Sequence, residues 1–206
     1  EEHLECIGYA VKKIAHRIPV IAGTGANDTA HGVRLSTAAE KLGADALLQV
    51  TPYYNKASQR GLVKHFTAIA NSVNIPIVLY NVPSRTGCNI SIDTYKELAK
   101  VPNIVATKEA SGNMSLAAEI AAYTDLDIYS GNDDQVLPIL SLGGKGVISV
   151  TSNLMPREKH DEVALFNEGK VAEALAIQAK ILALEKALFM DLNPIPVKEA
   201  LIIMCF

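Results

Sequence analysis

The chain has 206 residues, which is enough for one large domain or two small ones with a sizeable core. Apolar residues make up 49% and charged residues 20%, and the formal net charge is -3. Acidic and basic residues are mixed along the chain, so we expect neither a basic surface for nucleic acid nor a basic amphipathic face for a membrane. No stretch is typical of a signal peptide or a membrane span. The composition favours small-molecule chemistry.

The residues that could form disulfides or bind a metal are few. The cysteines Cys6, Cys88 and Cys205 are odd in number and widely scattered, which favours reduced thiols in the cytoplasm. The five histidines have no ligand spacing and share no carboxylate. We therefore expect a cytoplasmic protein without a metal site.

Apolar runs alternate with amphipathic helical patterns along the whole chain. An amphipathic helix is predicted over residues 1–17, and a second helix, capped by Asn27 or Asp28, ends near residue 42. The expected strands are 19–25, 46–50, 75–80, 103–110, 127–131 and 146–150. The other expected helices are 58–71, 92–100, 114–123, 134–142, 155–170, 171–190 and 195–204.

This alternation predicts an α/β fold with a parallel sheet. The spacing of about 20 to 28 residues per unit suits the (β/α)₈ TIM barrel. A doubly wound open sheet is the alternative, but the Gly23-Thr-Gly25 segment lacks the third glycine of a dinucleotide-binding turn. A barrel would be missing its first two strands, so we expect a fragment or the ordered part of a longer protein. Residues 1–152 would form the partial barrel and 153–206 its last helix and the carboxyl-terminal helices.

Candidate catalytic residues follow the predicted strands, because active sites of this barrel lie at the carboxyl ends of its strands. A lysine in an apolar barrel mouth loses hydration of its ammonium form, and the neutral amine can then attack carbonyls. A tyrosine beside it can relay protons, and an arginine fork matches a carboxylate. The plainer alternatives are that the lysine is only the solvated end of a strand, that the tyrosines only pack there, and that the arginine lies in a solvated loop. The carboxyl ends of six strands on one rim favour an active site instead. The candidates are Tyr53, Tyr54, Tyr80, Arg85, Lys108, Gly131 and Ile148.

Six motifs make the chain similar to one known family. They are VTPYYN at 50–55, YNVPSRTG at 80–87, KEA at 108–110, SGND at 130–133, GGKGVIS at 143–149 and NPIPVK at 193–198. Together they resemble the dihydrodipicolinate synthase family, also called 4-hydroxy-tetrahydrodipicolinate synthases, which are class I aldolase-like barrels that bind pyruvate. The resemblance covers essentially the whole chain.

The resemblance implies a lyase that condenses pyruvate with L-aspartate 4-semialdehyde in the diaminopimelate route to lysine. No cofactor or metal is implied, since the protonated imine is itself the electron sink. By the resemblance, Lys108 forms the Schiff base with pyruvate, and Tyr80 relays protons together with Tyr54 of a neighbouring subunit. Arg85 is implied to bind the carboxylate of the semialdehyde. Gly131 and Ile148 are implied to contact pyruvate through their backbone groups, with Asn193 close by.

The resemblance also implies a homotetramer built as a dimer of dimers. Family members that lysine inhibits bind it through residues matching Asn27 and Tyr53, but a glutamate is usual where this chain has His31. The relay threonine of the family, in a Gly-Thr-Thr-Gly-Glu stretch, is absent from this sequence. N-acetylneuraminate lyases and keto-deoxy-sugar aldolases are the nearest alternatives, and they lack an arginine at the position of Arg85. A non-catalytic barrel remnant is the alternative from another class.

Overall fold

The computed structural model describes residues 1–206, in which short strands alternate with helices. The strands form one sheet in the order β1-β2-β3-β4-β5-β6. The neighbours β1 and β2, β2 and β3, β3 and β4, and β5 and β6 pair in parallel. Chain-ordered parallel strands joined by helices are the repeating unit of the (β/α)₈ barrel. The strands are β1 Ile21–Gly23, β2 Ala46–Val50, β3 Ile77–Asn81, β4 Ile104–Glu109, β5 Asp127–Ser130 and β6 Gly146–Val147.

Ten α-helices and two short 3₁₀ turns complete the fold, and none of these helices is long and apolar enough to cross a membrane. The 3₁₀ turns are Asp133–Gln135 and Thr151–Asn153. The helices are α1 Glu2–Ile14, α2 Thr29–Lys41, α3 Gln59–Ala70, α4 Pro83–Thr86, α5 Ile92–Leu98, α6 Met114–Tyr123, α7 Val136–Ser141, α8 Pro156–Asn167, α9 Val171–Ala187 and α10 Ile195–Ile203.

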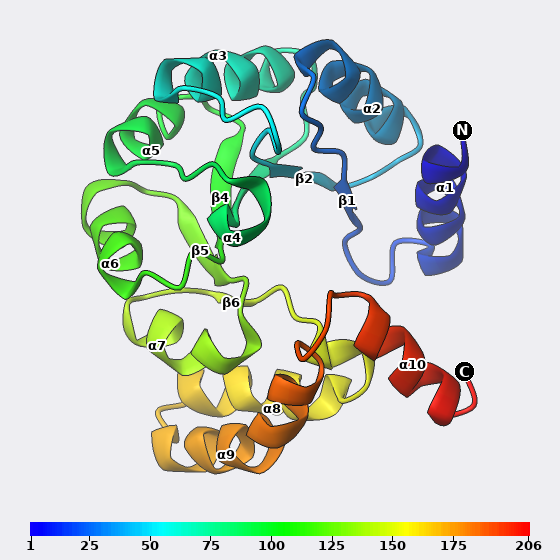
Figure 1. Cartoon of the computed structure of the whole chain (residues 1–206), viewed down its shortest axis with the longest axis vertical. Helices are drawn as coiled ribbons and strands as arrows, with labels where there is room; N and C mark the ends of the chain where they lie inside the picture. Colours follow the sequence, from blue (N-terminus) through cyan, green and yellow to red (C-terminus); the bar gives the residue numbers. More distant parts are fainter. The chain divides into compact units, whose positions relative to one another are not determined.

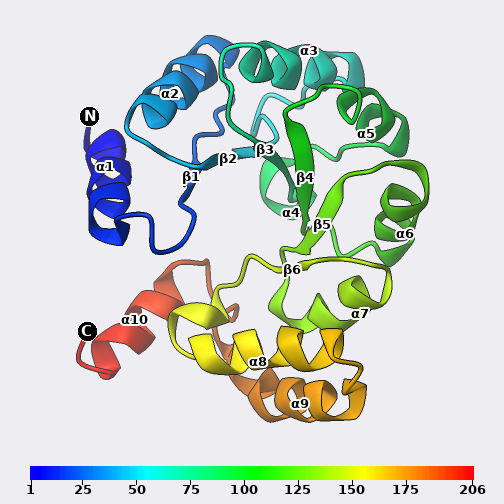
Figure 2. The same cartoon turned by 180° about the vertical axis from the view of Figure 1, so that it is seen from behind.

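The chain divides into two compact units, residues 1–128 and 129–206. In the first unit, helices α2, α3, α5 and α6 lie on the outer side of the strands (Figures 1 and 2). The interface between these helices and the strands is mostly apolar, and burial of its apolar side chains is the main stabilising contribution. Side chains buried there include Leu47, Leu62, Phe66, Ile69, Ile77 and Leu79.

Polar caps determine where four helices of the first unit begin. The side chains of Asp28, Ser58, Ser91 and Asn113 each accept a hydrogen bond from a backbone N–H in the first turn of the following helix. Each such cap stabilises a helix by about 1 kcal/mol. Of the two caps predicted for α2, Asp28 is the one used, and it accepts from the His31 N–H at 2.7 Å.

The exit from β1 is a close approach that only glycine permits. β1 ends at Gly23, and the Thr24 N–H donates to the Leu48 carbonyl at 3.1 Å. A Cβ on Gly25 would lie 2.4 Å from the Val50 backbone nitrogen and 2.7 Å from its Cγ1. The loop after β1 therefore packs directly on the last residue of β2, as expected of a tight strand exit.

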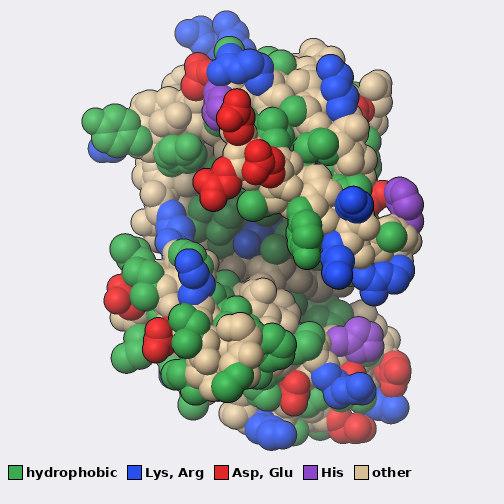
Figure 3. Space-filling model, turned by 90° about the vertical axis from the view of Figure 1, so that its right-hand side faces the viewer, with side chains coloured by type: hydrophobic (Ala, Val, Ile, Leu, Met, Phe, Trp, Pro, Cys, Tyr) green, Lys and Arg blue, Asp and Glu red, His purple; other side chains and the backbone are tan.

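The second unit packs α7, α8 and α9 around an apolar cluster that includes Val136, Leu140 and Ala174. Helices α8 and α9 lie side by side (Figure 1). On the face of the molecule shown in Figure 3, basic and acidic side chains both appear among apolar and uncharged ones.

A buried ionic group holds the second unit together around Lys159, which is 2% exposed. Its Nζ lies 2.7 Å from Glu162 Oε2, 2.9 Å from Glu185 Oε1 and 3.8 Å from Asp133 Oδ1. Burial alone would lower the pKa of Lys159, but its interactions with the carboxylates of Glu162 and Glu185 together outweigh burial and raise it. Removing one partner of such a group leaves an uncompensated buried charge, so the group ties α8 to α9.

Some predicted elements have different limits in the structure. α1 ends at Ile14 rather than residue 17, because Ala15 and His16 adopt left-handed backbone conformations with φ of 49° and 58°. β6 stops at Val147 rather than residue 150, because the N–H groups of Val150 and Thr151 donate to the Asp133 carboxylate instead of to a strand. Helix α4 was not predicted.

Candidate active site

Parallel register places one residue from each of three strands in a row across the sheet. Tyr80 of β3 pairs with Val50 of β2 on one side and with Lys108 of β4 on the other. All three lie at or next to the carboxyl ends of their strands. Since residues paired across a sheet point to the same face, the phenol and the amine predicted as catalytic are brought together.

The side chains of Tyr80 and Lys108 are in contact. The Nζ atom of Lys108 lies 4.2 Å from the centroid of the Tyr80 ring, within the range of a cation–π interaction. Both side chains are half-buried, between the interior and the surface. A half-buried amine remains open to a small carbonyl compound while its position is restricted by the aromatic ring.

Burial raises the pKa of the Tyr80 phenol above its ordinary value of 10.0, and the charge of Arg85 partly offsets this effect by lowering it. The phenol therefore stays protonated at neutral pH and can donate a proton. Arg85 lies close enough to affect the pKa of the Tyr80 phenol, although the Arg85 side chain is itself exposed.

Replacing Arg85 with alanine should raise the pKa of Tyr80 further, because it removes a positive charge that favours the phenolate. The measurement is a spectroscopic titration of tyrosinate formation, with the Tyr80→Phe variant subtracted to isolate this residue. An unchanged or lowered pKa in Arg85→Ala would contradict the electrostatic coupling of the two side chains.

Arg85 is held by helix α4, a single turn that begins with Pro83 and ends before Gly87, whose φ of 68° suits a glycine cap. Thr86 anchors this turn because its buried hydroxyl accepts a hydrogen bond from Thr51 Oγ1 at 3.0 Å, and its single hydrogen has two acceptors within reach, the Cys88 carbonyl at 3.0 Å and the Val82 carbonyl at 3.2 Å. The arginine therefore stands on an anchored turn rather than in an unsupported loop.

A hollow of about 440 Å³ opens beside the row of strand ends. Tyr80 and Arg85 both line it, and Lys108 does not line it but lies against Tyr80. The volume is in the range that holds a small metabolite. The residues around it are Gly23, Gly25, Leu48, Val50, Tyr53, Tyr80, Val82, Arg85 and Thr86.

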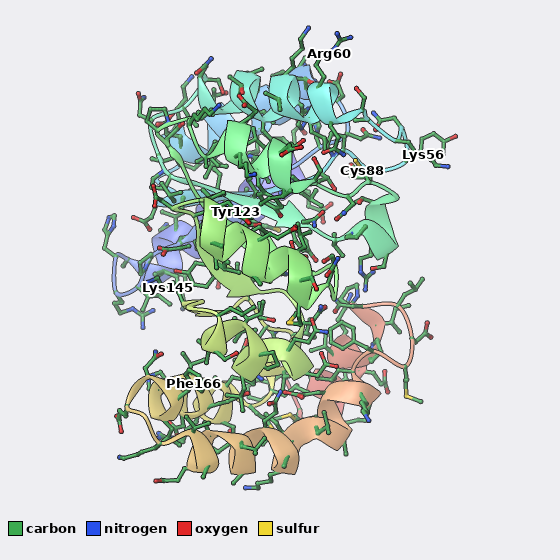
Figure 4. The ribbon with its side chains drawn as sticks, turned by 90° about the vertical axis from the view of Figure 1, so that its left-hand side faces the viewer. Lys56, Arg60, Cys88, Tyr123, Lys145 and Phe166 are labelled. Carbon is green, nitrogen blue, oxygen red and sulfur yellow. The ribbon has the colours of Figure 1, made fainter.

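The Tyr54 side chain is 90% exposed, so within one chain it is not packed into the site. Its backbone is unusual, with φ of 75°, and its N–H donates to the Thr86 carbonyl at 3.3 Å. Lys56, two residues later, points away from the body of the unit (Figure 4). The predicted relay tyrosine is therefore presented outward on a loop attached to α4.

Asn27 and Tyr53, predicted as an inhibitor site, lie on the loops after β1 and β2. The Asn55 side chain joins these loops by donating to the Asn27 carbonyl at 2.9 Å. Tyr53 is 43% exposed and lines the hollow, whereas Asn27 does not.

The remaining predicted residues belong to the second unit. Gly131 follows β5 directly, and the Ile148 N–H donates to the Ser130 carbonyl at 2.9 Å, so these two positions are brought together. The Asp133 carboxylate accepts hydrogen bonds from Ser149 Oγ and from backbone N–H groups beyond it, which fixes the turn after Ile148. Asn193 is half-buried and lies in the turn before α10.

Sequence reasoning missed the polar groups that support these side chains. The Thr51 to Thr86 hydrogen bond has no periodic signal, since the two residues are distant in the chain. Strand alternation indicates that Asn81 and Glu109, which follow Tyr80 and Lys108, face away from the site, but it does not indicate that the Glu109 carboxylate is buried.

A model of the dihydrodipicolinate synthetase family matches residues 1–206. The 4-hydroxy-tetrahydrodipicolinate synthase of Caldicellulosiruptor saccharolyticus is 58% identical over 207 residues, which cover 100% of this chain and 70% of that protein. The synthase of Acetivibrio thermocellus is 55% identical over 206 residues, covering 99% of this chain and 70% of the relative. The chain thus spans about 70% of the length of these relatives.

Solved structures agree with these relatives. A crystal structure of a dihydrodipicolinate synthase superposes with a TM-score of 0.97 at 48% identity, covering 98% of this chain and 71% of that one. The synthase of Acinetobacter baumannii in complex with pyruvate superposes with a TM-score of 0.95 at 44% identity, covering 98% and 70%. The predicted fold, six parallel strands of a (β/α)₈ barrel followed by helices, is confirmed.

The fold and these similarities define a barrel lyase of amino-acid biosynthesis. The chain belongs to the dihydrodipicolinate synthetase family. Its activity is that of 4-hydroxy-tetrahydrodipicolinate synthase, the condensation of pyruvate with L-aspartate 4-semialdehyde in lysine biosynthesis. The predicted family and reaction are confirmed, and the sugar-lyase alternatives are not favoured.

Proposed function

We propose that Lys108 is the nucleophile of this reaction and that Tyr80 moves protons at the imine formed on it. The observation that carries the proposal is the contact of the Lys108 amine with the Tyr80 ring at 4.2 Å, imposed by the register of β3 and β4. A positioned acid beside a nucleophilic amine is what imine chemistry requires.

The steps follow from ordinary carbonyl chemistry. The Lys108 nitrogen attacks the ketone carbon of pyruvate, and the resulting carbinolamine loses water to give a protonated imine. Tyr80 donates a proton to the departing hydroxyl group, which its raised pKa supports because the phenol is protonated at neutral pH. The Tyr80 phenolate then takes a methyl proton from the imine, which gives the enamine and restores the phenol.

The enamine carbon then attacks the aldehyde carbon of the semialdehyde and forms the new carbon–carbon bond. The aldehyde oxygen takes up a proton and becomes the hydroxyl group of the product. The amino group of the semialdehyde attacks the imine carbon, closes the ring and displaces the Lys108 amine. No redox step occurs, and Lys108 is returned to its starting state.

Arg85 binds the carboxylate of the semialdehyde in this proposal. Arg85 lines the same hollow as Tyr80, and the planar fork of a guanidinium suits a carboxylate. In the second unit, Gly131 and Ile148 would contact pyruvate through backbone groups, and Asn193 would lie close by. The joined positions of Gly131 and Ile148 support their common role.

The Arg85→Ala variant should lose about 10- to 100-fold in kcat/KM for the semialdehyde, the value of a hydrogen-bonded charge. Pyruvate imine formation, measured by borohydride trapping without the semialdehyde, should change far less. Lys96→Ala, which removes an exposed cation from the outer surface, is the matched control. Equal losses in both half-reactions would contradict the role of Arg85.

We further propose a cytoplasmic homotetramer, a dimer of dimers in which Tyr54 completes the proton relay of a neighbouring subunit. Its 90% exposed side chain supports a partner outside its own chain. Asn27 and Tyr53 are the proposed lysine-binding residues, and a relative from Cyanidioschyzon merolae has been solved with lysine bound. Residues 1–152 remain the proposed barrel part and 153–206 the helical part.

The proposed chemistry is tested by reducing the protein with borohydride in the presence of pyruvate. The expected mass gain equals pyruvate minus water plus two hydrogens, located on Lys108 by peptide mapping. An unchanged intact mass would refute imine formation and support a non-catalytic remnant.

A further inference from the structure

Behind the pair Tyr80 and Lys108 lies a second, buried pair. The register of β3 and β4 joins Asn81 to Glu109 next to the row that joins Tyr80 to Lys108. Because successive residues of a strand point to opposite faces, Asn81 and Glu109 face the helices rather than the site. Asn81 is 0% exposed and Glu109 is 2% exposed.

The Glu109 carboxylate is surrounded by hydrogen-bond donors. Oε1 accepts from the Ser111 N–H at 2.7 Å, and Oε2 accepts from Tyr95 Oη at 3.2 Å and from Asn81 Nδ2 at 3.1 Å. Both oxygens therefore act as acceptors, which suits a carboxylate and not an amide. Three elements meet at this side chain, namely β3, α5 and the turn after β4.

The donors cannot simply reorient. Asn81 Oδ1 accepts from the Ile90 N–H at 3.1 Å, and its Nδ2 also donates to Asn89 Oδ1 at 2.8 Å, so turning the amide would break both bonds. The fully buried Tyr95 also has its Oη 3.1 Å from Thr107 Oγ1. Burial, and next the charge of Glu109, raise the pKa of Tyr95 far above its ordinary value, so the phenol keeps its proton.

We propose that Glu109 is a positioning residue that locks the carboxyl ends of β3 and β4 in register and thereby holds the Lys108 amine against Tyr80. The inference rests on the proposed roles of Lys108 and Tyr80. Its physical basis is that the hydrogen bond from Asn81 to Glu109 crosses the two strands one residue beyond the reacting pair. A shift of about 1 Å between catalytic groups can cost about 100-fold in rate.

The Glu109→Gln variant tests the proposal, because glutamine keeps the volume but turns one acceptor into a donor. Its amide nitrogen would face the Asn81 amide or the Ser111 N–H, and the strand ends must shift to separate the two donors. In the intact protein, kcat should fall by about 10- to 100-fold, while KM for pyruvate changes by less than about threefold.

Two variants separate positioning from general stability. Asn103→Ala removes a half-buried hydrogen bond of 2.9 Å to the Ala70 carbonyl just before the amino end of β4, opposite the strand ends of the proposed site, and should lower the melting temperature without lowering kcat. Tyr95→Phe removes one donor to Glu109 and keeps the ring, so kcat should fall by about three- to tenfold. If Glu109→Gln does not fold, parental kcat in Tyr95→Phe overturns the proposal.

A double-mutant cycle measures whether the effects of Glu109 and Tyr80 on kcat are coupled, which a purely structural role of Glu109 does not predict. In a Tyr80→Phe background, Glu109→Gln should lower kcat by a smaller factor than it does in the parent protein, because phenylalanine cannot transfer a proton and the disturbed geometry then matters less. The role of Glu109 is overturned if the double variant loses kcat by the product of the two single losses. It is also overturned if Glu109→Gln keeps the parental kcat, or if its KM for pyruvate rises by as much as its kcat falls. Failure of the parent protein to be trapped on Lys108 refutes the proposed chemistry instead, so the two failures are distinct.

Discussion

Replacing Lys108 with alanine should abolish the borohydride-dependent mass gain with pyruvate and lower kcat by at least about 10⁴-fold, the order seen when a covalent nucleophile is removed. The reason is that the Lys108 amine lies 4.2 Å from the centroid of the Tyr80 ring, so the variant loses the amine that the proposed proton donor would serve. The measurements are intact mass after reduction and steady-state turnover of both substrates.

The control for this experiment is Lys100→Ala. Lys100 is an exposed lysine of the same unit whose Nζ lies 2.7 Å from Glu97 Oε1 at the surface. Such surface ion pairs contribute little to stability, so this variant should keep parental trapping and turnover. Retention of the pyruvate adduct in Lys108→Ala would show that another amine is the nucleophile.

Replacing Tyr80 with phenylalanine should lower kcat by about 10²- to 10³-fold, the usual contribution of a positioned general acid–base group. The ring is kept, so the Lys108 amine retains its aromatic neighbour, and trapping by borohydride should be slower but complete. This combination separates proton transfer from positioning of the nucleophile. Two measurements are needed, the rate at which the borohydride-trapped adduct forms and the steady-state kcat.

Tyr123→Phe is the matched control for this loss. Tyr123 lies at the end of α6 on the surface, is 62% exposed and has Lys96 over its ring at 4.6 Å (Figure 4). It offers the same aromatic–lysine contact outside the proposed site. A kcat for Tyr80→Phe within about threefold of the parent would remove Tyr80 from the relay, since even weak acid–base catalysis exceeds this factor.

Most of the barrel could be predicted because its units repeat and their hydrophobic periods are clear. The strand at Ala46–Val50 and the helix at Met114–Tyr123 have the predicted limits. The short β6 could not be foreseen, because the residues after it bond to the Asp133 carboxylate, which lies 17 and 18 residues earlier in the chain than Val150 and Thr151. Helix α4 is one turn long, too short for any periodicity to be visible.

The candidate site was predictable to the extent that it depends on strand ends. Tyr80 and Lys108 stand at the ends of adjacent strands, but the register that pairs them also depends on an irregularity between Ile77 and Val78, which the apolar pattern does not predict. Glu109 was not predictable as a buried group, because glutamate after a strand normally faces solvent. Its burial requires Tyr95 from α5, a tertiary contact that no local pattern contains.

Because of the close approach at Gly25, the hollow can be enlarged by substitutions at Leu48 but not reshaped by substitutions at Gly25. Any side chain there must displace the backbone of Val50, which stands in the same row as Tyr80 and Lys108, so a change at the rim would be transmitted to the nucleophile. Leu48 lines the same hollow and can be shortened without moving that backbone. A library intended to admit bulkier aldehydes should therefore vary Leu48 and leave Gly25 unchanged.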